Sequence, residues 1–136
     1  MIIPNGASLK SAVRAALEEL NLHFAGSTEF QDLGDGGAAV TINNLSLRDS
    51  PYEQPDTWCG FTVTFAHPYA DIYPHFVRPD LTRRDKGPFG PAINVGRDFY
   101  GRSAIMLSRR VKHAEPELTV NPIIKLEKVM SWLITR

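Results

Sequence analysis

Cysteine is almost absent from this sequence of 136 residues: Cys59 is its one thiol, so no internal disulfide can form. A chain without disulfides fits a reducing compartment. Long apolar runs are lacking too, because no stretch reaches the roughly eighteen residues that indicate a transmembrane helix. The start of the sequence has no basic leader followed by an apolar core, which argues against a secretion signal. We therefore expect a cytoplasmic protein that does not contact a membrane.

Motifs of common enzymes and metal sites are also lacking. The sequence contains no GxSxG, no GxxxxGK[ST] and no HExxH. Gly34–Gly37 lacks the strand-to-helix context of a phosphate-binding loop and instead predicts a reversal between two strands. Seven residues separate His67 from His75, a spacing that fits no compact metal site. We predict no metal ion and no cofactor.

The net charge is zero, but the charges are distributed unevenly. Residues 1–76 carry three basic and nine acidic side chains, a balance of −6, whereas residues 77–113 carry nine basic and three acidic ones, a balance of +6. Such asymmetry indicates an acidic partner or ligand for residues 77–113. The alternative is that this basic segment lies beside the acidic one within the fold. The sequence leaves both open.

What is present predicts one α+β domain over residues 1–136, since the length suits a single core. Apolar residues at helical spacing predict a first helix, with Ser8 as its N-cap and Asn21 as its end. Asn121-Pro122 is a typical start for a C-terminal helix. Between the helices we expect an antiparallel meander of three to four strands. The expected strands are Thr28–Leu33, Ala38–Leu47, Trp58–Phe65 and a short Phe76-Val77.

Residues 49–81 are the most distinctive stretch. Phe61–Phe65 alternates apolar and polar residues, as a half-buried strand does. Prolines and aromatic residues on both sides predict a stiff, irregular exit from this strand, with a cis bond expected at Tyr73-Pro74. Residues 82–103 lack a clear pattern and predict a long irregular flap. Ser103–Leu107, which follows, is a short apolar run that we expect to pack on the core in extended form.

Several segments resemble the ubiquitin-conjugating enzyme superfamily, the UBC/RWD-like fold, over residues 8–134. Asp49–Tyr52 is similar to the family's turn between its second and third strands, and Phe61–Phe65 to its third strand. Tyr69–Pro74 lies at the proline-rich crossing, where Tyr69 and Pro74 match the family and the residues between them depart from it. Glu115–Val120 resembles the segment that leads into the family's central helix. The resemblance implies a first helix, a meander, a crossing, a flap and a helix.

The departures from the family concern its chemistry. Family members carry a modifier as a thioester on an exposed cysteine that follows a His-Pro-Asn motif. The corresponding region, Ile93–Leu107, contains neither, and Met106 is the expected occupant of the cysteine's position. Cys59 lies in a predicted strand, where a lone cysteine is typically a small core residue. The resemblance therefore implies a divergent, bacterial-type member without conjugating activity.

Our leading hypothesis is a non-catalytic binding module of a bacterial conjugation-type system. Its expected partner is a ubiquitin-like modifier or an activating-enzyme-like protein. The expected contact residues are the basic side chains of the middle segment: Arg83, Arg84, Lys86, Arg97, Arg102, Arg109, Arg110 and Lys112.

Two alternatives remain open. The first is an enzyme that uses His113 as acid or base in place of a cysteine, assisted by Tyr100 or Ser103. The second is a nucleic-acid-binding domain, because the basic segment at 83–112 is interleaved with Phe89, Phe99 and Tyr100, which could stack on bases. The simpler interpretations are that His113 is a surface histidine and that the basic segment at 83–112 is a solvated loop.

Overall fold

A computed structural model describes residues 8–109 and 119–136, which form an α+β fold of two helices and a six-stranded antiparallel sheet. The sheet has the strand order β1-β2-β3-β4-β6-β5. The elements are α1 (Ser11–His23), β1 (Thr28–Asp32), β2 (Ala38–Ser46), β3 (Asp56–Val63), β4 (His75–Val77), β5 (Ile93–Phe99), β6 (Arg102–Leu107) and α2 (Pro122–Leu133).

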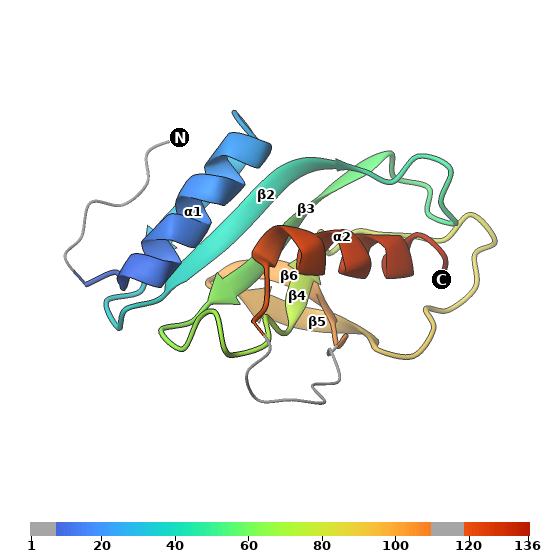
Figure 1. The fold of residues 1–136 in the computed structure, drawn as a ribbon. Coiled ribbons are helices and arrows are strands. Elements are labelled where there is room, and N and C mark those ends of the chain that lie inside the picture. The colour runs from blue at the N-terminus through green and yellow to red at the C-terminus, as the bar shows by residue number, and fades with distance from the viewer. Residues whose placement is uncertain (1–7, 110–118) are drawn as a thin grey trace.

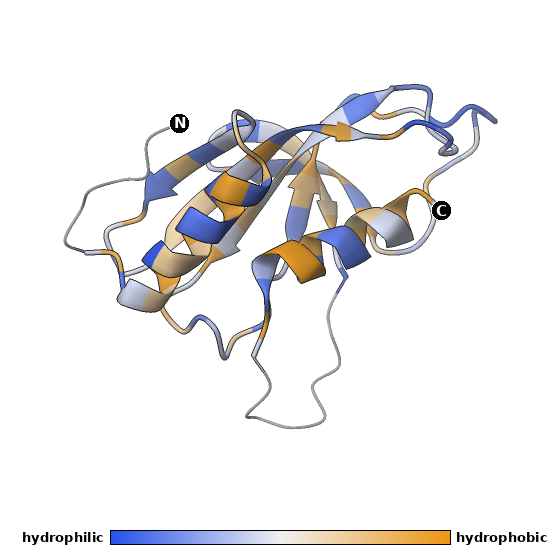
Figure 2. Ribbon diagram, turned by 45° about the horizontal axis from the view of Figure 1, so that its top comes forward, coloured by the Kyte–Doolittle hydropathy of each residue, from blue (hydrophilic) through white to orange (hydrophobic). Residues whose placement is uncertain are grey.

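Both helices lie on the same face of the sheet, which we call the inner face (Figure 1). β3 shows the division most clearly, since neighbouring side chains of a strand point to opposite faces. Cys59, Phe61 and Val63 belong to the main core with both helices, whereas Trp58 belongs to a second, smaller cluster on the outer face. Hydrophobic residues accordingly recur along both helices and the strands they cover (Figure 2).

The predicted limits of the first helix are wrong at both ends. Ser8 does not cap the helix; its hydroxyl lies 2.7 and 2.8 Å from the two carboxylate oxygens of Asp32. The helix begins at Ser11, and Lys10 precedes it without a side-chain cap. Asn21 does not end it, because its side-chain oxygen accepts a hydrogen bond from the Thr28 hydroxyl at 2.9 Å. The side chain is thereby used in a tertiary contact, and the helix continues to His23.

Several other expectations are confirmed. β1 to β4 lie within a few residues of the predicted strands, and Gly34–Gly37 makes the reversal between β1 and β2. The Tyr73-Pro74 bond is cis, as is His67-Pro68. The side-chain oxygen of Asn121 accepts hydrogen bonds from the backbone N–H groups of Ile123 and Ile124, so α2 begins where predicted.

The irregular flap expected over residues 82–103 is wrong in part, because β5 and the start of β6 lie within it, and the sheet has six strands rather than three or four. Ser103–Leu107 is extended as expected, with Ile105 and Leu107 in the main core. β5 has a register shift between Asn94 and Arg97, and the residues in its middle are exposed. Together these features remove the alternation of apolar and polar residues that marks a strand. The connecting turn is Tyr100-Gly101, with φ of 49° and 87°. Two left-handed residues are typical of a type I′ turn, in which asparagine or glycine, not tyrosine, is the usual first residue.

Candidate functional site: a groove on the outer face

The tip of the β5–β6 hairpin lies against the outer face of β3. The Tyr100 hydroxyl is hydrogen-bonded to the Thr62 hydroxyl at 2.9 Å. The ring of Phe99 covers Gly60, where an added β-carbon would fall 2.5 Å from the nearest ring atom. A side chain at position 60 and the Phe99 ring therefore exclude each other, and the glycine is what allows the tip to dock.

We expect Gly60→Ala to destabilise the fold by about 1–3 kcal/mol, the usual cost of overpacking. The added methyl group must displace the Phe99 ring. Urea denaturation of the two proteins measures the difference. Gly90→Ala is the matched control, since its new methyl group would meet no atom within 4 Å. Equal stability of Gly60→Ala and the parent protein would contradict the docked position of the hairpin.

A third contact joins the hairpin to β3. The guanidinium carbon of Arg102 lies 3.9 Å from the centroid of the Trp58 ring. The indole is 8% exposed, and Arg102 itself is exposed to solvent. Planar stacking of this kind fixes the guanidinium plane while its N–H groups stay directed outward. The stack forms one wall of a hollow.

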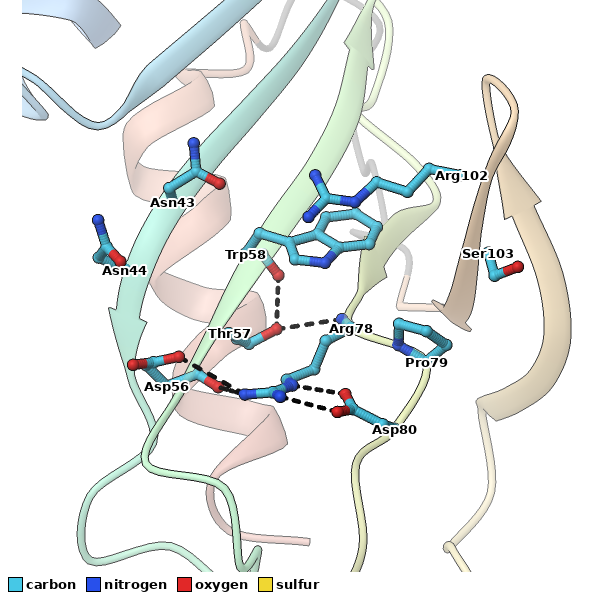
Figure 3. A pocket seen from close by; sticks show the side chains of 10 residues that line it. All are labelled: Asn43, Asn44, Asp56, Thr57, Trp58, Arg78, Pro79, Asp80, Arg102 and Ser103. Carbon is cyan, nitrogen blue, oxygen red and sulfur yellow. Dashed lines mark hydrogen bonds and ion pairs between the residues drawn. The ribbon is translucent and has the colours of Figure 1, made fainter.

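This hollow, which we call the outer groove, has a volume of about 580 Å³ and lies over one end of β2 and β3 (Figure 3). Residues from four separate segments line it, so it exists only in the folded sheet. They are Asn43, Asn44, Asp56, Thr57, Trp58, Arg78, Pro79, Asp80, Arg102 and Ser103. Asn43 and Asn44 lie at the register shift of β2, and Asn44 has a φ of 58°. This bulge sets two amide side chains at the rim of the groove.

Arg78 occupies the floor of the outer groove, between Asp80 and Asp56. Its Nε and Nη2 donate to Asp80 at 2.6 and 2.8 Å, and its Nη1 donates to the Asp56 carbonyl oxygen at 3.0 Å. The hydrogen bonds from Arg78 hold the pKa of the Asp80 carboxyl below its usual range. All three residues are thus used within the protein, and Arg78 acts as a structural crosslink (Figure 3).

The predicted partner-binding residues do not all lie together. Those in the loop after β4 have partners in the chain: Arg83 the carboxylate of Asp85, Arg84 the carbonyl oxygen of Ser50 and Lys86 the carboxylate of Glu53. The pair of Lys86 and Glu53, like that of Arg78 and Asp56, joins the basic segment to the acidic one. For Lys86 and Arg78 the structure supports the self-complementary alternative, whereas the carboxylate beside Arg83 belongs to the basic segment itself.

The other predicted basic residues have different surroundings. Arg97 and Arg102 lie on the β5–β6 hairpin, and the structure gives neither of them a carboxylate partner among residues 8–109 and 119–136. Arg109 lies beside α2, with its guanidinium carbon 5.8 Å from the Trp132 ring centroid. Arg110 and Lys112 lie outside the described residues.

Two of the three predicted catalytic candidates lie on the β5–β6 hairpin. Tyr100 is in the hairpin turn and bonds to Thr62. Ser103 lines the outer groove from β6, on the side of the strand away from Trp58 (Figure 3). His113 lies outside the described residues. Among those described, no group of three or more His, Cys, Asp or Glu side chains is placed to hold a metal ion.

The positions of the thiol and of Met106 bear on the expected chemistry. Cys59 is wholly buried in the main core, as predicted, and burial raises the pKa of its thiol to about 12. Met106 lies on β6, opposite Phe76 of β4 and Asn94 of β5. The sequence's one sulfhydryl is therefore protonated and inaccessible at neutral pH.

A second group of titratable residues lies inside the protein, between α2 and the segment before β4. The Lys125 ammonium is 3.1 Å from an Asp71 carboxylate oxygen and donates to the Arg109 carbonyl oxygen at 3.0 Å. The side chains of Lys125 and Asp71 are only 2% and 12% exposed. His75 is fully buried, and neither of its ring nitrogens has a hydrogen-bond partner among the described residues. Burial, with the Lys125 charge adding to it, lowers the His75 pKa to about 3.

The sequence alone did not point to Trp58, Arg78 or the two asparagines of the groove. One signal was present in the sequence. Side chains alternate between the two faces of a strand, so Trp58 lies on the face opposite to that of Cys59 and Phe61, which is the outer face. Comparison with protein-family models, curated proteins and solved structures finds no match to the chain. In the described part of the chain, no helix has the length and apolar character to cross a membrane.

Proposed function

We propose that the protein is a non-catalytic, ubiquitin-conjugating-like domain that binds a protein partner. The partner class is a ubiquitin-like modifier or another protein of a bacterial conjugation-type system. The order of elements supports the fold assignment: a first helix, antiparallel strands, a proline-rich crossing and a final helix on the same face as the first. The β5–β6 hairpin is a departure from the resemblance, because it adds two strands to the meander.

The burial of Cys59 carries the proposal. A thioester carrier needs an accessible thiolate, and this sequence has one cysteine, buried beneath two helices with a pKa of about 12. The hairpin supplies what a binding domain needs instead: an open groove beside exposed arginines that no described carboxylate neutralises. Binding without covalent transfer is the function that this combination supports best.

Calorimetry with candidate ubiquitin-like and activating-enzyme-like proteins tests the proposal. We expect saturable binding, and Cys59→Ala should bind with the same affinity because the thiol takes no part. Gel analysis without reducing agent should show no covalent adduct in either protein. Absence of binding to every candidate, or a thiol-sensitive adduct that Cys59→Ala abolishes, would refute it.

A further inference from the structure

We infer that the face of the β5–β6 hairpin beside the outer groove receives an extended acidic segment of the partner, with two carboxylates two residues apart bound by Arg97 and Arg102. This inference rests on the proposed function and specifies the chemistry of its partner. The basic side chains of the protein differ in whether they form ion pairs. Arg78, Arg83, Lys86 and Lys125 form ion pairs within the chain, whereas Arg97 and Arg102 form none with the described residues.

The two arginines lie on one face of the hairpin. Arg97 is opposite Ala104, and Arg102 is opposite Phe99, so Arg97 and Arg102 are diagonal neighbours across the two strands. Diagonal neighbours in a sheet are roughly 7–8 Å apart. Residues two apart on an extended chain are about 6.6–6.8 Å apart and share a face. An extended segment with acidic residues at alternate positions therefore matches the spacing of the two arginine positions on the hairpin.

Arg102 is prepared for such a contact. Its guanidinium carbon lies 3.9 Å from the centroid of the Trp58 ring, and its N–H groups make no hydrogen bond to a residue in the described ranges. A guanidinium edge binds a carboxylate through two parallel hydrogen bonds. Because the stack already restricts the side chain, less conformational entropy is lost when the carboxylate binds.

The hollowed surface around Arg102 is elongated, because it consists of two adjacent hollows. A second hollow, of about 250 Å³, lies over β1 and β2 on the other side of the hairpin tip, and Arg102 lines both hollows. Ala39 and Thr41 line the second, and Asn43 lines the outer groove. These three residues alternate along β2, so the two hollows follow one strand. Arg97 lines neither hollow and lies further from the hairpin turn than Arg102. A segment in extended conformation that is bound at both arginines can continue into a hollow, whereas a single small ligand would fill only one end.

The carboxylates of the surface restrict where the acidic residues can lie. Asp56 and Asp80 are paired with Arg78, and Glu29, at the far hollow, accepts a hydrogen bond from Asn43 at 2.8 Å. An acidic residue placed over Glu29 would be repelled. We therefore expect the acidic pair of the segment at the hairpin arginines and neutral residues over β1.

Fluorescence anisotropy with labelled synthetic peptides tests this inference on the full chain. The probe is an otherwise neutral peptide with two glutamates at alternate positions. One control peptide has glutamines at those positions, and another has the two glutamates adjacent, so that they point to opposite sides of an extended chain. We expect each control to bind about tenfold more weakly or worse, since one or both charge-assisted contacts are lost.

Protein variants locate the contact. Arg97→Gln and Arg102→Lys should each weaken binding of the alternating peptide about tenfold. Arg102→Lys keeps the charge and removes the planar fork, and Arg97→Gln alters an exposed side chain, so both variants should fold. Lys128→Gln, an exposed charge on α2 on the opposite face, is the matched control and should bind normally.

Four results would overturn the inference. Equal binding of the alternating and adjacent peptides, or equal loss with Lys128→Gln and Arg97→Gln, would indicate unspecific charge attraction. Tighter binding of single-stranded oligothymidine, with the same dependence on both arginines, would assign the groove to nucleic acid. If a partner protein identified by calorimetry binds both arginine variants as tightly as the parent protein, the inference is refuted and the proposed function is left intact. If the peptide binds but no candidate partner does, the proposed function fails and the peptide site stands.

Discussion

Lys125→Met is expected to lower the free energy of unfolding by about 3–5 kcal/mol, the usual result of removing one partner of a buried ion pair. The variant leaves the Asp71 carboxylate, 12% exposed, without its cation. It also removes the donor to the Arg109 carbonyl oxygen at the end of the described segment. Urea denaturation at neutral pH measures the loss, and the exposed neighbour Lys128→Met should change stability by no more than about 0.5 kcal/mol.

The double variant Lys125→Met with Asp71→Asn separates two explanations of that loss. If the penalty comes from an uncompensated buried charge, the double variant should recover most of the stability, because replacing both charges removes the desolvation cost. If the two single effects simply add, the pair is not the cause. Loss of helix packing would then be the explanation, and the account of Lys125 as the tie between α2 and the crossing would be wrong.

The second large effect expected is a loss of stability in mild acid that depends on His75. Burial lowers the pKa of this histidine from 6.5 to about 3, so the unfolded chain binds a proton at pH values where the folded protein does not. A depressed pKa of a base contributes stability that is complete above pH 6.5 and is lost as the pH falls toward 3. Between pH 7 and pH 5 this one group should cost about 2 kcal/mol.

His75→Phe should remove that part of the pH dependence. The substitution keeps a ring beside Phe61, whose centroid lies 5.3 Å away, and eliminates two buried nitrogens that have no partner among the described residues. Denaturation at pH 7 and pH 5 should show a difference about 2 kcal/mol smaller in the variant than in the parent. His23→Gln, at an exposed histidine of α1, should retain the parent's difference. An unchanged difference in His75→Phe would show that other groups dominate the acid response.

Local signals in the sequence predicted much of the fold. Asn121-Pro122 is sufficient to predict the start of α2, because the Asn121 cap and the fixed φ of Pro122 act within one helical turn. The strands from Thr28 to Val63 alternate or are continuously apolar over much of their length. β5 could not be found this way, since its register shift breaks the alternation and its turn uses Tyr100 where sequence rules expect asparagine.

The candidate site was less accessible to sequence reasoning because it depends on pairings across long distances. Arg83 and Arg102 look alike in the sequence, yet one meets a carboxylate two residues away and the other stacks on Trp58, which precedes it by 44 residues. The charge asymmetry left open an acidic partner and pairing of the basic segment within the fold. It could not say which of them remain available, because that is decided by packing.

The shortness of β4 has a mechanical consequence for the whole sheet. Three residues, His75–Val77, join the three strands on one side to β6 and β5 on the other, with two paired positions toward β3 and three toward β6. The described sheet is therefore two half-sheets connected by a narrow seam. The contact of the Phe99 ring with Gly60 is a second connection between the two half-sheets, independent of β4, and it fixes their orientation relative to each other. Shape at the groove is thus set by one aromatic ring and one missing side chain.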